Sequence, residues 1–506
     1  MKHIFLKKIL LIFVFAICAN LSAQDQNKPV EDAPAETTES EDSKESAPSS
    51  TGISLVAGAT TADGKNYQVL GIRGDFPLGK LGLGLDIQLL FDESGAVRKD
   101  DWNEAKDYLD KIYYIRWAQK GDPFYIRVGG LDFTTIGYGA IVWGYSNMVE
   151  YPTYRRVGTE LSVDTDYLGA EMFLNDYKEL INKNPSVVAG GRLILKPLGN
   201  LLAIGGSVVS DFNQYNGLRD SDKDGYPDEI DLEPYNSRVV TEKDIYTSRN
   251  VTAGTIQELI DKGLLSPVDR SQLFKISENK QTVTVYGADA GINILNTDFV
   301  RFAIYSQWAQ IAQTKGWGYA APGVMVKVGP ARFTIDYRYS TDKFIFGYFN
   351  NSYELERASV TKNSDGTFTI MTKLKSMQNE KSKKGVFASF DLSLFDLLKF
   401  RTSYQMLMGA NKQSDQSLGA DLSVKDGLIP LVSDSKAYYV QNNVTDFRHF
   451  KTPSTIYGFQ FGFKVASGVS IIADNMYTFE DKDGNGLISG KEETNRIFSI
   501  STTSSF

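Results

Sequence analysis

The stretch LGLGLDIQL, residues 81–89, alternates apolar side chains with small or polar ones at every position. Successive side chains of a β-strand point to opposite faces of its sheet, so the leucines share one face with Ile87, while Asp86 and Gln88 lie on the other. The stretch therefore predicts a strand with one apolar face and one hydrophilic face.

The same period of two recurs along the chain from Gly52 to Phe506. The alternating runs are about ten residues long, which is the length with which a tilted strand crosses a bilayer. Aromatic side chains gather near the ends of the runs, as in Tyr113–Trp117 and Tyr337–Tyr339, where an interfacial girdle would lie. The clearest further runs are residues 332–339, 386–394 and 457–465.

Full charges lie in the middle of these runs, on the second face. They are Arg127, Arg332, Asp336, Arg338, Asp391 and Lys464. A single apolar face also fits a soluble sandwich, but ionised side chains suit a water-filled lumen better than a dry core. We therefore expect an all-β fold, a transmembrane antiparallel up-and-down β-barrel with long outer loops, over residues 51–506.

The connections between the runs alternate short and long. The short ones are Pro77–Lys80, Lys120–Pro123, Asp164–Asp166, Pro197–Asn200, Asn296–Asp298, Gly329–Ala331, Phe395–Leu398 and Ser467–Gly468. The long ones are Asp92–Asp110, Thr134–Val157, Asn175–Pro185, Asn213–Lys280 and Asp342–Lys384. Outer-membrane barrels have short periplasmic turns and long outer loops, and a chain that starts and ends in the periplasm needs an even strand number. We expect about 16–20 strands, with the count least defined over Ser417–Val444.

The first 23 residues have a basic start, a short apolar run and small residues before a cleavage site after Ala23, which predicts a secretory signal peptide. The alternative is a lipoprotein leader acylated at Cys18, although Ile17 is a bulky neighbour for such a site. Residues 24–50 are acidic and almost free of apolar side chains, which predicts a disordered acidic linker, with a specific binding tail as the alternative. Both interpretations of the first 23 residues, a signal peptide or a lipoprotein leader, place the protein outside the cytoplasm.

The leader, the alternation and the terminal Phe506 together resemble Gram-negative outer-membrane barrel proteins of the porin-like kind. In that family the last strand ends in Phe and carries alternating apolar residues that the barrel-assembly machinery recognises. Phe498 and Ile500 match this pattern, whereas Thr502 and Ser504 depart from it. The resemblance implies an outer-membrane location in contact with lipid, and it does not identify a solute.

Composition excludes several classes of function. The formal net charge of −8 gives no electrostatic reason to bind nucleic acid. The single cysteine lies in the leader, so the mature chain cannot form an internal disulfide or use a thiol nucleophile. His449 has no recognisable nucleophile motif around it, and we expect no enzymatic activity.

Residues 481–492, DKDGNGLISGKE, have the spacing of an EF-hand loop. The oxygen donors at positions one, three, five, seven, nine and twelve would be Asp481, Asp483, Asn485, Leu487, Ser489 and Glu492, the leucine through its carbonyl. This predicts a Ca²⁺ site, with a plain polar turn as the alternative. Because the flanking segments read as strands, we expect a hairpin tip and not a helix–loop–helix sensor.

Residues 220–231, DSDKDGYPDEID, form a second acidic loop that resembles the calcium repeats of thrombospondin type 3 modules. The expected donors are Asp220, Asp222, Asp224, the carbonyl of Tyr226, Asp228 and Asp231. Pro227 and the short Asp231 depart from the EF-hand form, and the alternative is a solvated loop. The loop belongs to a long outer insertion, residues 213–280, with an amphipathic helix expected over Thr255–Leu265.

The third outer loop, Thr134–Val157, is unusually apolar and aromatic. General porins fold their third loop into the lumen, and the resemblance suggests the same here, with Glu150, Arg155 and Arg156 near a pore constriction. Acid opposed to base across a narrow passage would create a transverse field that screens polar solutes. The alternative is a loop that packs on the barrel rim.

The sequence therefore favours a porin-like channel for passive passage of small hydrophilic solutes, with surface loops stabilised by calcium. The first alternative is a surface adhesin that binds a host or surface ligand on a closed or plugged barrel. A barrel lipid hydrolase and a soluble secreted β-protein are further alternatives. A homo-oligomer is compatible with the sequence, but no residue pattern identifies an interface.

Overall fold

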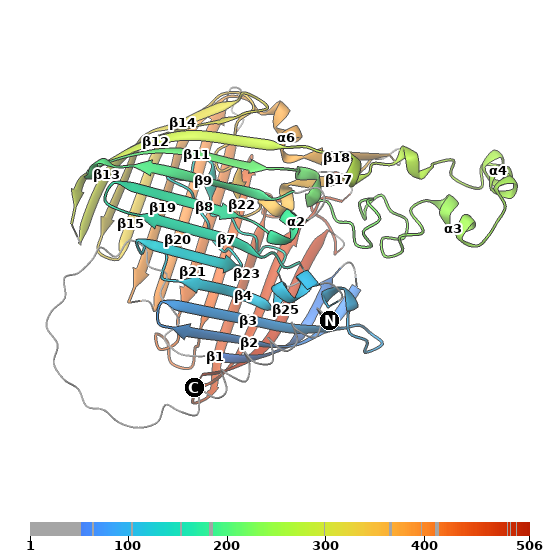
Figure 1. Cartoon of the computed structure of the whole chain (residues 1–506), viewed down its shortest axis with the longest axis horizontal. Coiled ribbons are helices and arrows are strands. Elements are labelled where there is room, and N and C mark those ends of the chain that lie inside the picture. The colour runs from blue at the N-terminus through green and yellow to red at the C-terminus, as the bar shows by residue number, and fades with distance from the viewer. Residues whose placement is uncertain are drawn as a thin grey trace. The chain divides into compact units, whose positions relative to one another are not determined.

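The computed structural model describes residues 52–62, 65–102, 105–151, 154–181, 186–297, 299–363, 367–395, 397–409, 414–482, 484–485, 487–491 and 493–505. Within them, twenty strands form one closed sheet, because β1 (Gly52–Ala62) pairs with β25 (Thr494–Ser505) (Figure 1). All neighbours in this sheet are antiparallel. The predicted fold class is confirmed, at the upper end of the expected strand number.

The other strands of the barrel follow one another around it. They are β2 (Lys65–Leu78), β3 (Leu81–Phe91), β4 (Ile112–Trp117), β5 (Phe124–Gly129), β7 (Gly158–Asp164), β8 (Leu168–Leu174), β9 (Val188–Leu195), β11 (Leu202–Asp211), β12 (Val283–Asn296), β13 (Val300–Ile311), β14 (Trp317–Val328), β15 (Ala331–Ser340), β19 (Lys383–Leu394), β20 (Leu398–Gly409), β21 (Ser414–Val424), β22 (Ser435–Val444), β23 (Ile456–Ala466) and β24 (Val469–Phe479).

The connections contain short elements of their own. The strands are β6 (Val142–Trp143), β10 (Pro197–Asn200), β16 (Phe349–Asn350), β17 (Ala358–Lys362) and β18 (Phe368–Thr372). The α-helices are α2 (Tyr177–Ile181), α3 (Glu242–Ser248), α4 (Ala253–Asp261), α5 (Tyr353–Glu356) and α6 (Lys373–Ser376). The 3₁₀ helices are η1 (Lys99–Asp101), η2 (Ala105–Lys111), η3 (Gln214–Gly217), η4 (Arg270–Gln272), η5 (Ile276–Glu278) and η6 (Met377–Asn379).

The two faces of the barrel wall differ as the alternation predicts. On β3, Asp86 and Gln88 point inward and are buried, while Ile87 between them points outward and is 39% exposed. The exposed apolar side chains of the outer face include Leu55, Leu70, Ile72, Leu193, Ile204, Val208, Ile304, Val386, Phe459 and Phe461. An apolar belt that surrounds a closed barrel requires lipid around it, because water does not favour so large an exposed apolar surface.

Aromatic rings mark both edges of this belt. At one edge Trp308, Tyr319 and Tyr339 face one another across neighbouring strands, and the ring centroids of the two tyrosines are 5.5 Å apart. At the other edge Phe333 faces Phe390. Phe333 and Tyr339 are separated by about 20 Å along β15 at the usual strand rise, which is close to the height of an outer-membrane apolar band.

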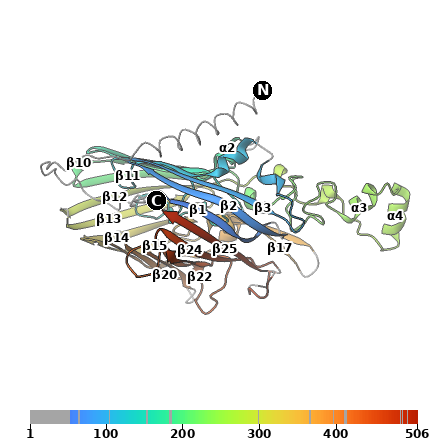
Figure 2. The same ribbon diagram turned by 90° about the horizontal axis from the view of Figure 1, so that it is seen from below.

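The two ends of the barrel are unlike. One end carries turns such as residues 79–80 and 329–330, and we call it the short-turn end; the long-loop end carries residues 130–157, 212–282 and 341–382 (Figure 2). The alternation is not strict, because residues 312–316 form a short connection at the long-loop end. Residues 425–434 form a longer connection at the short-turn end, in the region where the expected strand count was least defined.

Among the described residues, no helix is both long enough and apolar enough to cross a bilayer. The apolar belt, its aromatic edges and the even strand number place the closed sheet in the outer membrane, with the long loops outside. The expected signal peptide (residues 1–23) and acidic linker (residues 24–50) lie outside the described residues.

Candidate functional site

The inner wall of the barrel is lined by charges that pair with one another between strands, either neighbouring strands or, as for β9 and β12, strands on either side of a third. Arg192 of β9 binds Asp289 of β12 at 2.5 Å and Glu171 of β8 at 3.3 Å. Arg401 of β20 likewise lies 3.1 Å from Asp391 of β19, and both side chains keep more than a third of their surface exposed. Charges in these positions require water or a partner nearby, and here they have both.

Loop A, which we define as residues 130–157, folds into the lumen against β13. The ring of Tyr138 stacks on inward-facing Tyr305, with centroids 4.1 Å apart and planes 4° from parallel. Gln307 accepts a hydrogen bond from the amide of Ala140 at 3.0 Å and donates one to the carbonyl of Tyr138 at 3.3 Å. Gly291 of β12 provides space for the Tyr138 hydroxyl, which would overlap any Cβ at that position.

Loop B, residues 341–382, meets loop A inside the barrel. β6 of loop A pairs in parallel with β16 of loop B, so that Val142 faces Phe349. The amide of Phe349 donates to the carbonyl of Ile141 at 3.1 Å, and that of Gly347 donates to Ala140 at 2.9 Å. A two-residue ladder is a weak interaction by itself, so the side chains around it must stabilise this arrangement.

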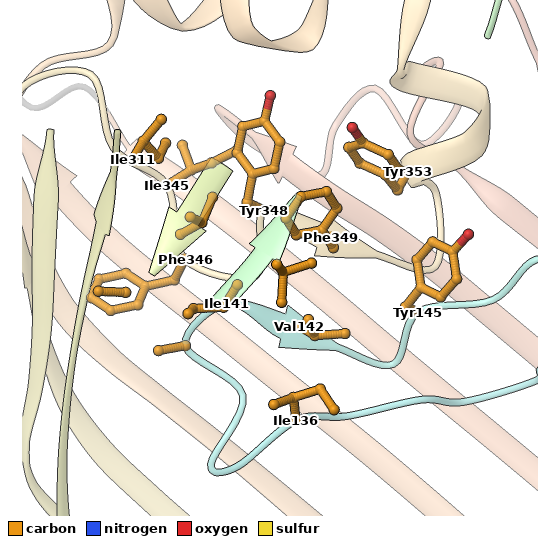
Figure 3. Packing of buried hydrophobic residues seen from close by; sticks show 14 of the residues in the cluster. Ile136, Ile141, Val142, Tyr145, Ile311, Ile345, Phe346, Tyr348, Phe349 and Tyr353 are labelled. Carbon is orange, nitrogen blue, oxygen red and sulfur yellow. The ribbon is translucent and has the colours of Figure 1, made fainter. Parts of the chain in front are cut away.

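A buried apolar core surrounds this ladder (Figure 3). Loop A contributes Ile136, Ala140, Ile141, Val142 and Tyr145, and loop B contributes Phe344, Ile345, Phe346, Tyr348, Phe349, Tyr353, Leu374 and Met377. Inward side chains of the wall complete it, among them Val188, Val209, Val285, Ala309 and Ile311. Full burial of one large apolar side chain contributes about 1.5–3 kcal/mol, so the core holds both loops inside the barrel. Loop A also reaches the short-turn end, where Phe133 lies 3.9 Å from the guanidinium of Arg401 and accepts a hydrogen bond from Lys120.

Arg357 of loop B anchors this core to the wall. Its guanidinium is fully buried and lies 2.7 Å from Asp211 of β11, 3.4 Å from Glu354 and 3.6 Å from Glu179 of α2. Tyr353 donates a hydrogen bond to the same Asp211 at 2.7 Å. One cation thus joins loop B to the barrel and to the connection between β8 and β9.

The predicted constriction residues are found in two separate contacts. Glu150 and Arg156 form an ion pair at 2.7 Å, and Arg219 of the long insertion reaches Glu150 at 3.4 Å. Burial alone would raise the pKa of Glu150, but these two guanidinium groups lower it. Arg155 donates instead to the carbonyls of Asp86 and Asp110, at 2.8 and 3.1 Å. Arg156 also lies 3.5 Å from Glu354 of loop B, so it joins the two loops. Glu150 and Arg156 are in direct contact and do not face each other across an opening.

The acidic loop at residues 220–231 brings three predicted ligands together. Carboxylate oxygens of Asp220, Asp222 and Asp224 lie within 4.8 Å of one another. Gly225 at the sixth position has a φ of +100°, and its amide donates to Asp220 at 2.8 Å. One oxygen each of Asp222 and Asp224 is buried without a hydrogen-bond partner. This carboxylate set suits a hard cation such as Ca²⁺.

Asp228 and Asp231, the other two carboxylates among the predicted ligands, have different surroundings. Asp228 is engaged by Ser221, whose amide and hydroxyl donate to it at 2.8 and 2.7 Å. Asp231 is 8% exposed, and burial, with the charges of Asp222 and Asp224 adding to it, raises its pKa to about 7. Burial and the neighbouring carboxylates therefore together raise the pKa of Asp231. The carboxylate of Asp228, in contrast, accepts its hydrogen bonds from Ser221 of the same loop.

The loop at residues 481–492 joins β24 to β25 as a hairpin connection. Leu487 donates its amide to Asn485 at 2.7 Å, and the amide of Ser489 donates to Glu493 at 2.7 Å. The amide of Lys482 also donates to Glu493, at 3.1 Å, so this carboxylate closes the described part of the loop. Two predicted ligands, Asp483 and Glu492, lie outside the described residues.

The first acidic loop is packed against loop B. Ile230 belongs to a buried cluster with Tyr215, Leu218, and Ala358 and Val360 of β17. β17 follows directly after Arg357, so the acidic loop touches the segment that carries the buried cation. Through Arg219 the same loop is also linked to Glu150 of loop A.

Loop B was not expected to enter the lumen. The sequence signal was present, because residues 344–350, FIFGYFN, are as apolar and aromatic as the core of loop A. Arg357 gave no signal, since its role depends on Asp211 and Glu179, which are distant in the sequence. Pairing two apolar loops would have suggested a shared buried core.

No known protein family and no curated protein matches the sequence. Among solved structures, OprD from Pseudomonas aeruginosa is 9% identical, with 90% of this chain and 94% of that chain covered and a TM-score of 0.29. OccK3 (OpdO) from the same organism is 10% identical over 90% and 95% of the chains, with a TM-score of 0.33. The siderophore receptor PirA from Acinetobacter baumannii is 10% identical over 91% and 81%, with a TM-score of 0.31. At such scores the likeness adds nothing to the geometry described above.

Proposed function

We propose that the protein is a porin-like outer-membrane channel for passive passage of small hydrophilic solutes, narrowed on its long-loop side by loops A and B. The charged, partly exposed inner wall supports this most directly. A barrel of twenty strands is too wide for its own wall side chains to fill. The packed core of the two loops fills part of the lumen, and Phe133 of loop A reaches as far as Arg401. Ion pairs such as Arg401–Asp391 stay accessible to water near the short-turn end.

Solute uptake by liposomes tests this proposal. Liposomes that contain the protein should swell in small sugars at a rate that falls steeply with solute size, because the two loops restrict the passage. Protein-free liposomes are the control for leakage. Equal permeability to small and large sugars would show an unrestricted lumen, and swelling no faster than in protein-free liposomes would contradict a channel.

A second candidate is a surface-binding protein on a plugged barrel. It is favoured by the packed core of loops A and B and by the insertion at residues 212–282, whose α3 and α4 lie beyond the long-loop end (Figures 1 and 2). Leu264 and Leu232 of this insertion are 70% and 48% exposed. Removal of residues 232–269 should then abolish adhesion to host or matrix surfaces and leave solute uptake unchanged. Unaltered adhesion would reject this candidate.

We further propose that Ca²⁺ binds residues 220–231 and residues 481–492. Support for the first site is its three clustered carboxylates and two buried oxygens without partners. Support for the second is the EF-hand spacing on a hairpin connection. The role would be structural, because Ca²⁺ offsets the repulsion between carboxylates and orders the loop.

Assembly would depend on the last strand. Phe498 and Ile500 point outward on β25 beside Ala59 and Ala57 of β1, where the barrel closes. We infer that the barrel-assembly machinery recognises this strand, as the sequence resemblance implies. Loss of Phe506 should then lower the yield of folded protein in the outer membrane.

The described residues define no interface for a homo-oligomer.

A further inference from the structure

A row of aromatic side chains on the outer face of the barrel ends in a lysine near the long-loop end. Trp308 of β13 pairs with Tyr319 of β14, and Tyr319 pairs with Tyr339 of β15. The residue that pairs with Tyr339 on the next strand, β19, is Lys384. Its side chain is exposed, whereas the preceding Lys383 points into the lumen and is 6% exposed. Lys384 therefore faces the membrane at the outer aromatic edge of the apolar belt.

Two further lysines lie on the connections just beyond this row. Lys315 belongs to residues 312–316, between β13 and β14, and is exposed. Its carbonyl accepts a hydrogen bond at 3.0 Å from the side-chain amide of Gln310, which points outward on β13. Lys343 lies beside this connection, because the hydroxyl of Thr314 donates to its carbonyl at 3.0 Å. We define the outer lysine group as Lys315, Lys343 and Lys384.

The acids of the same connections are bound to other groups. Asp342 lies 3.7 Å from Lys381 and also accepts a hydrogen bond from a backbone amide at 2.7 Å. Glu380 binds Lys383 at 2.5 Å. In the part of the chain that the structure describes, the outer lysine group forms no ion pair with an acid. Residues 410–413, which complete this edge and lie outside the described residues, contain no acid.

The acids of the neighbouring strands point away from the membrane. Asp336 of β15, Asp391 of β19 and Asp415 of β21 all form ion pairs inside the lumen. The sequences of β13, β14 and β20 contain no acid. The lipid side of this sector therefore carries positive charge at its outer edge, and the acids of its strands are on the opposite face of the wall.

We infer that the outer lysine group binds the phosphate groups of lipids in the outer leaflet of the membrane. Trp and Tyr rings lie where the hydrocarbon meets the headgroups, so a lysine paired with Tyr339 lies at the same depth. An ammonium group is a compact charge on a flexible apolar stem, which suits a headgroup phosphate that has no fixed orientation. Basic residues at a membrane surface attract anionic lipids. This inference rests on the location in the outer membrane and not on the proposed channel function.

Native mass spectrometry of the folded protein in detergent tests this inference. The two probes are phosphatidic acid, whose phosphate is exposed, and phosphatidylcholine with the same acyl chains. The wild type should retain more phosphatidic acid than phosphatidylcholine. K315Q/K343Q/K384Q should retain roughly fivefold less phosphatidic acid than the wild type and an unchanged amount of phosphatidylcholine. The control K243Q/R249Q/K262Q, which removes three cations from the region of α3 and α4, should behave like the wild type.

The variant K315R/K343R/K384R keeps the three charges and should retain phosphatidic acid like the wild type, which separates a lost charge from a disturbed edge. Heat-modifiable migration on a gel shows whether each barrel is folded. If K315Q/K343Q/K384Q does not fold, Lys384→Gln gives the same readout with a smaller effect.

Two results would overturn the inference. One is equal retention of the two lipids by the wild type, and the other is equal retention of phosphatidic acid by the wild type and K315Q/K343Q/K384Q. Retention requires no conductance, so a wild type that binds phosphatidic acid and conducts no current would support the lipid site while contradicting the channel proposal.

Discussion

At the scale of single residues, the ion pairs of Arg357 fix the position of loop B in the lumen. It is fully buried and lies between Asp211, Glu354 and Glu179. Removal of one member of a buried charge cluster leaves the others without compensation, which costs about 3–5 kcal/mol. The cost falls on loop B and not on the sheet, because the ladder of the barrel does not involve this side chain.

Substitution of Arg357 by Met keeps most of its volume and removes its charge. We expect loop B to leave the lumen more often, and therefore faster cleavage of loop B by added protease while the barrel stays folded. Arg249→Met, on the exposed insertion, is the matched control. Equal cleavage rates for the two variants would show that Arg357 does not hold the loop.

Glu179 makes the same cluster sensitive to pH. Burial raises its pKa from 4.5 to about 7, Glu354 and Asp176 add to the shift, and Arg357 and Arg156 oppose it. The native state therefore holds a proton that the unfolded chain releases near pH 4.5. Its contribution to stability is complete below that pH and is lost as the pH rises through about 7.

The variant Glu179→Gln mimics the protonated side chain at every pH. Wild type and variant should have nearly equal stability at about pH 4.5, and the variant should be more stable by up to about 3 kcal/mol above pH 8. Thermal unfolding in detergent at several pH values measures the difference. A difference that does not grow with pH would contradict a raised pKa for Glu179.

At the scale of elements, the acidic loop at residues 220–231 connects the surface to both lumen loops. Ile230 packs on β17 of loop B, and Arg219 reaches Glu150 of loop A. An ordered acidic loop should therefore also order loops A and B. Chelation of Ca²⁺ should make the insertion accessible to protease first and loop B second.

The variant D222N/D224N removes two of the clustered carboxylates. We expect it to lose the calcium-dependent protection of the insertion against protease, because amide oxygens lack the charge that attracts the cation. E258Q/D261N on α4 removes two acids from the same insertion and should behave like the wild type. If the insertion of the wild type were equally resistant to protease with and without calcium, residues 220–231 would not form a structural Ca²⁺ site.

The strands could be predicted from the sequence, whereas the filling of the lumen could not. Alternation such as that of residues 81–89 reports directly on two faces, because the side-chain period of a strand is fixed. The ladder between Val142 and Phe349 depends instead on a match between two loops about 200 residues apart, which no local pattern encodes. The ends of β21 and β22 were poorly defined because a bulge near Gln416 and Leu418 interrupts their register.

The candidate site was predictable to the extent that its signals are local. The spacing of Asp220, Asp222 and Asp224 is enough to bring their carboxylates together. The predicted opposition of Glu150 to Arg156 assumed an open passage between them, whereas the two pair directly and are also bound by Arg219 and by Glu354 of loop B. Long-range partners decide such contacts.

At the scale of the whole molecule, we propose that the barrel of twenty strands encloses a water-filled passage that loops A and B narrow. Bulk swelling averages over many molecules, whereas current through one molecule reports the size of its opening. Removal of residues 140–150 deletes β6 and with it the ladder to loop B. The passage should then widen without a change in the barrel wall.

Single-channel current in a planar bilayer tests this claim most directly, with the wild type and the variant that lacks residues 140–150 recorded side by side. Heat-modifiable migration on a gel first shows that both barrels are folded. We expect discrete steps for the wild type and larger steps for the variant. Steps of equal size would show that loop A does not narrow the passage, and folded proteins that give no steps in either form would contradict a channel.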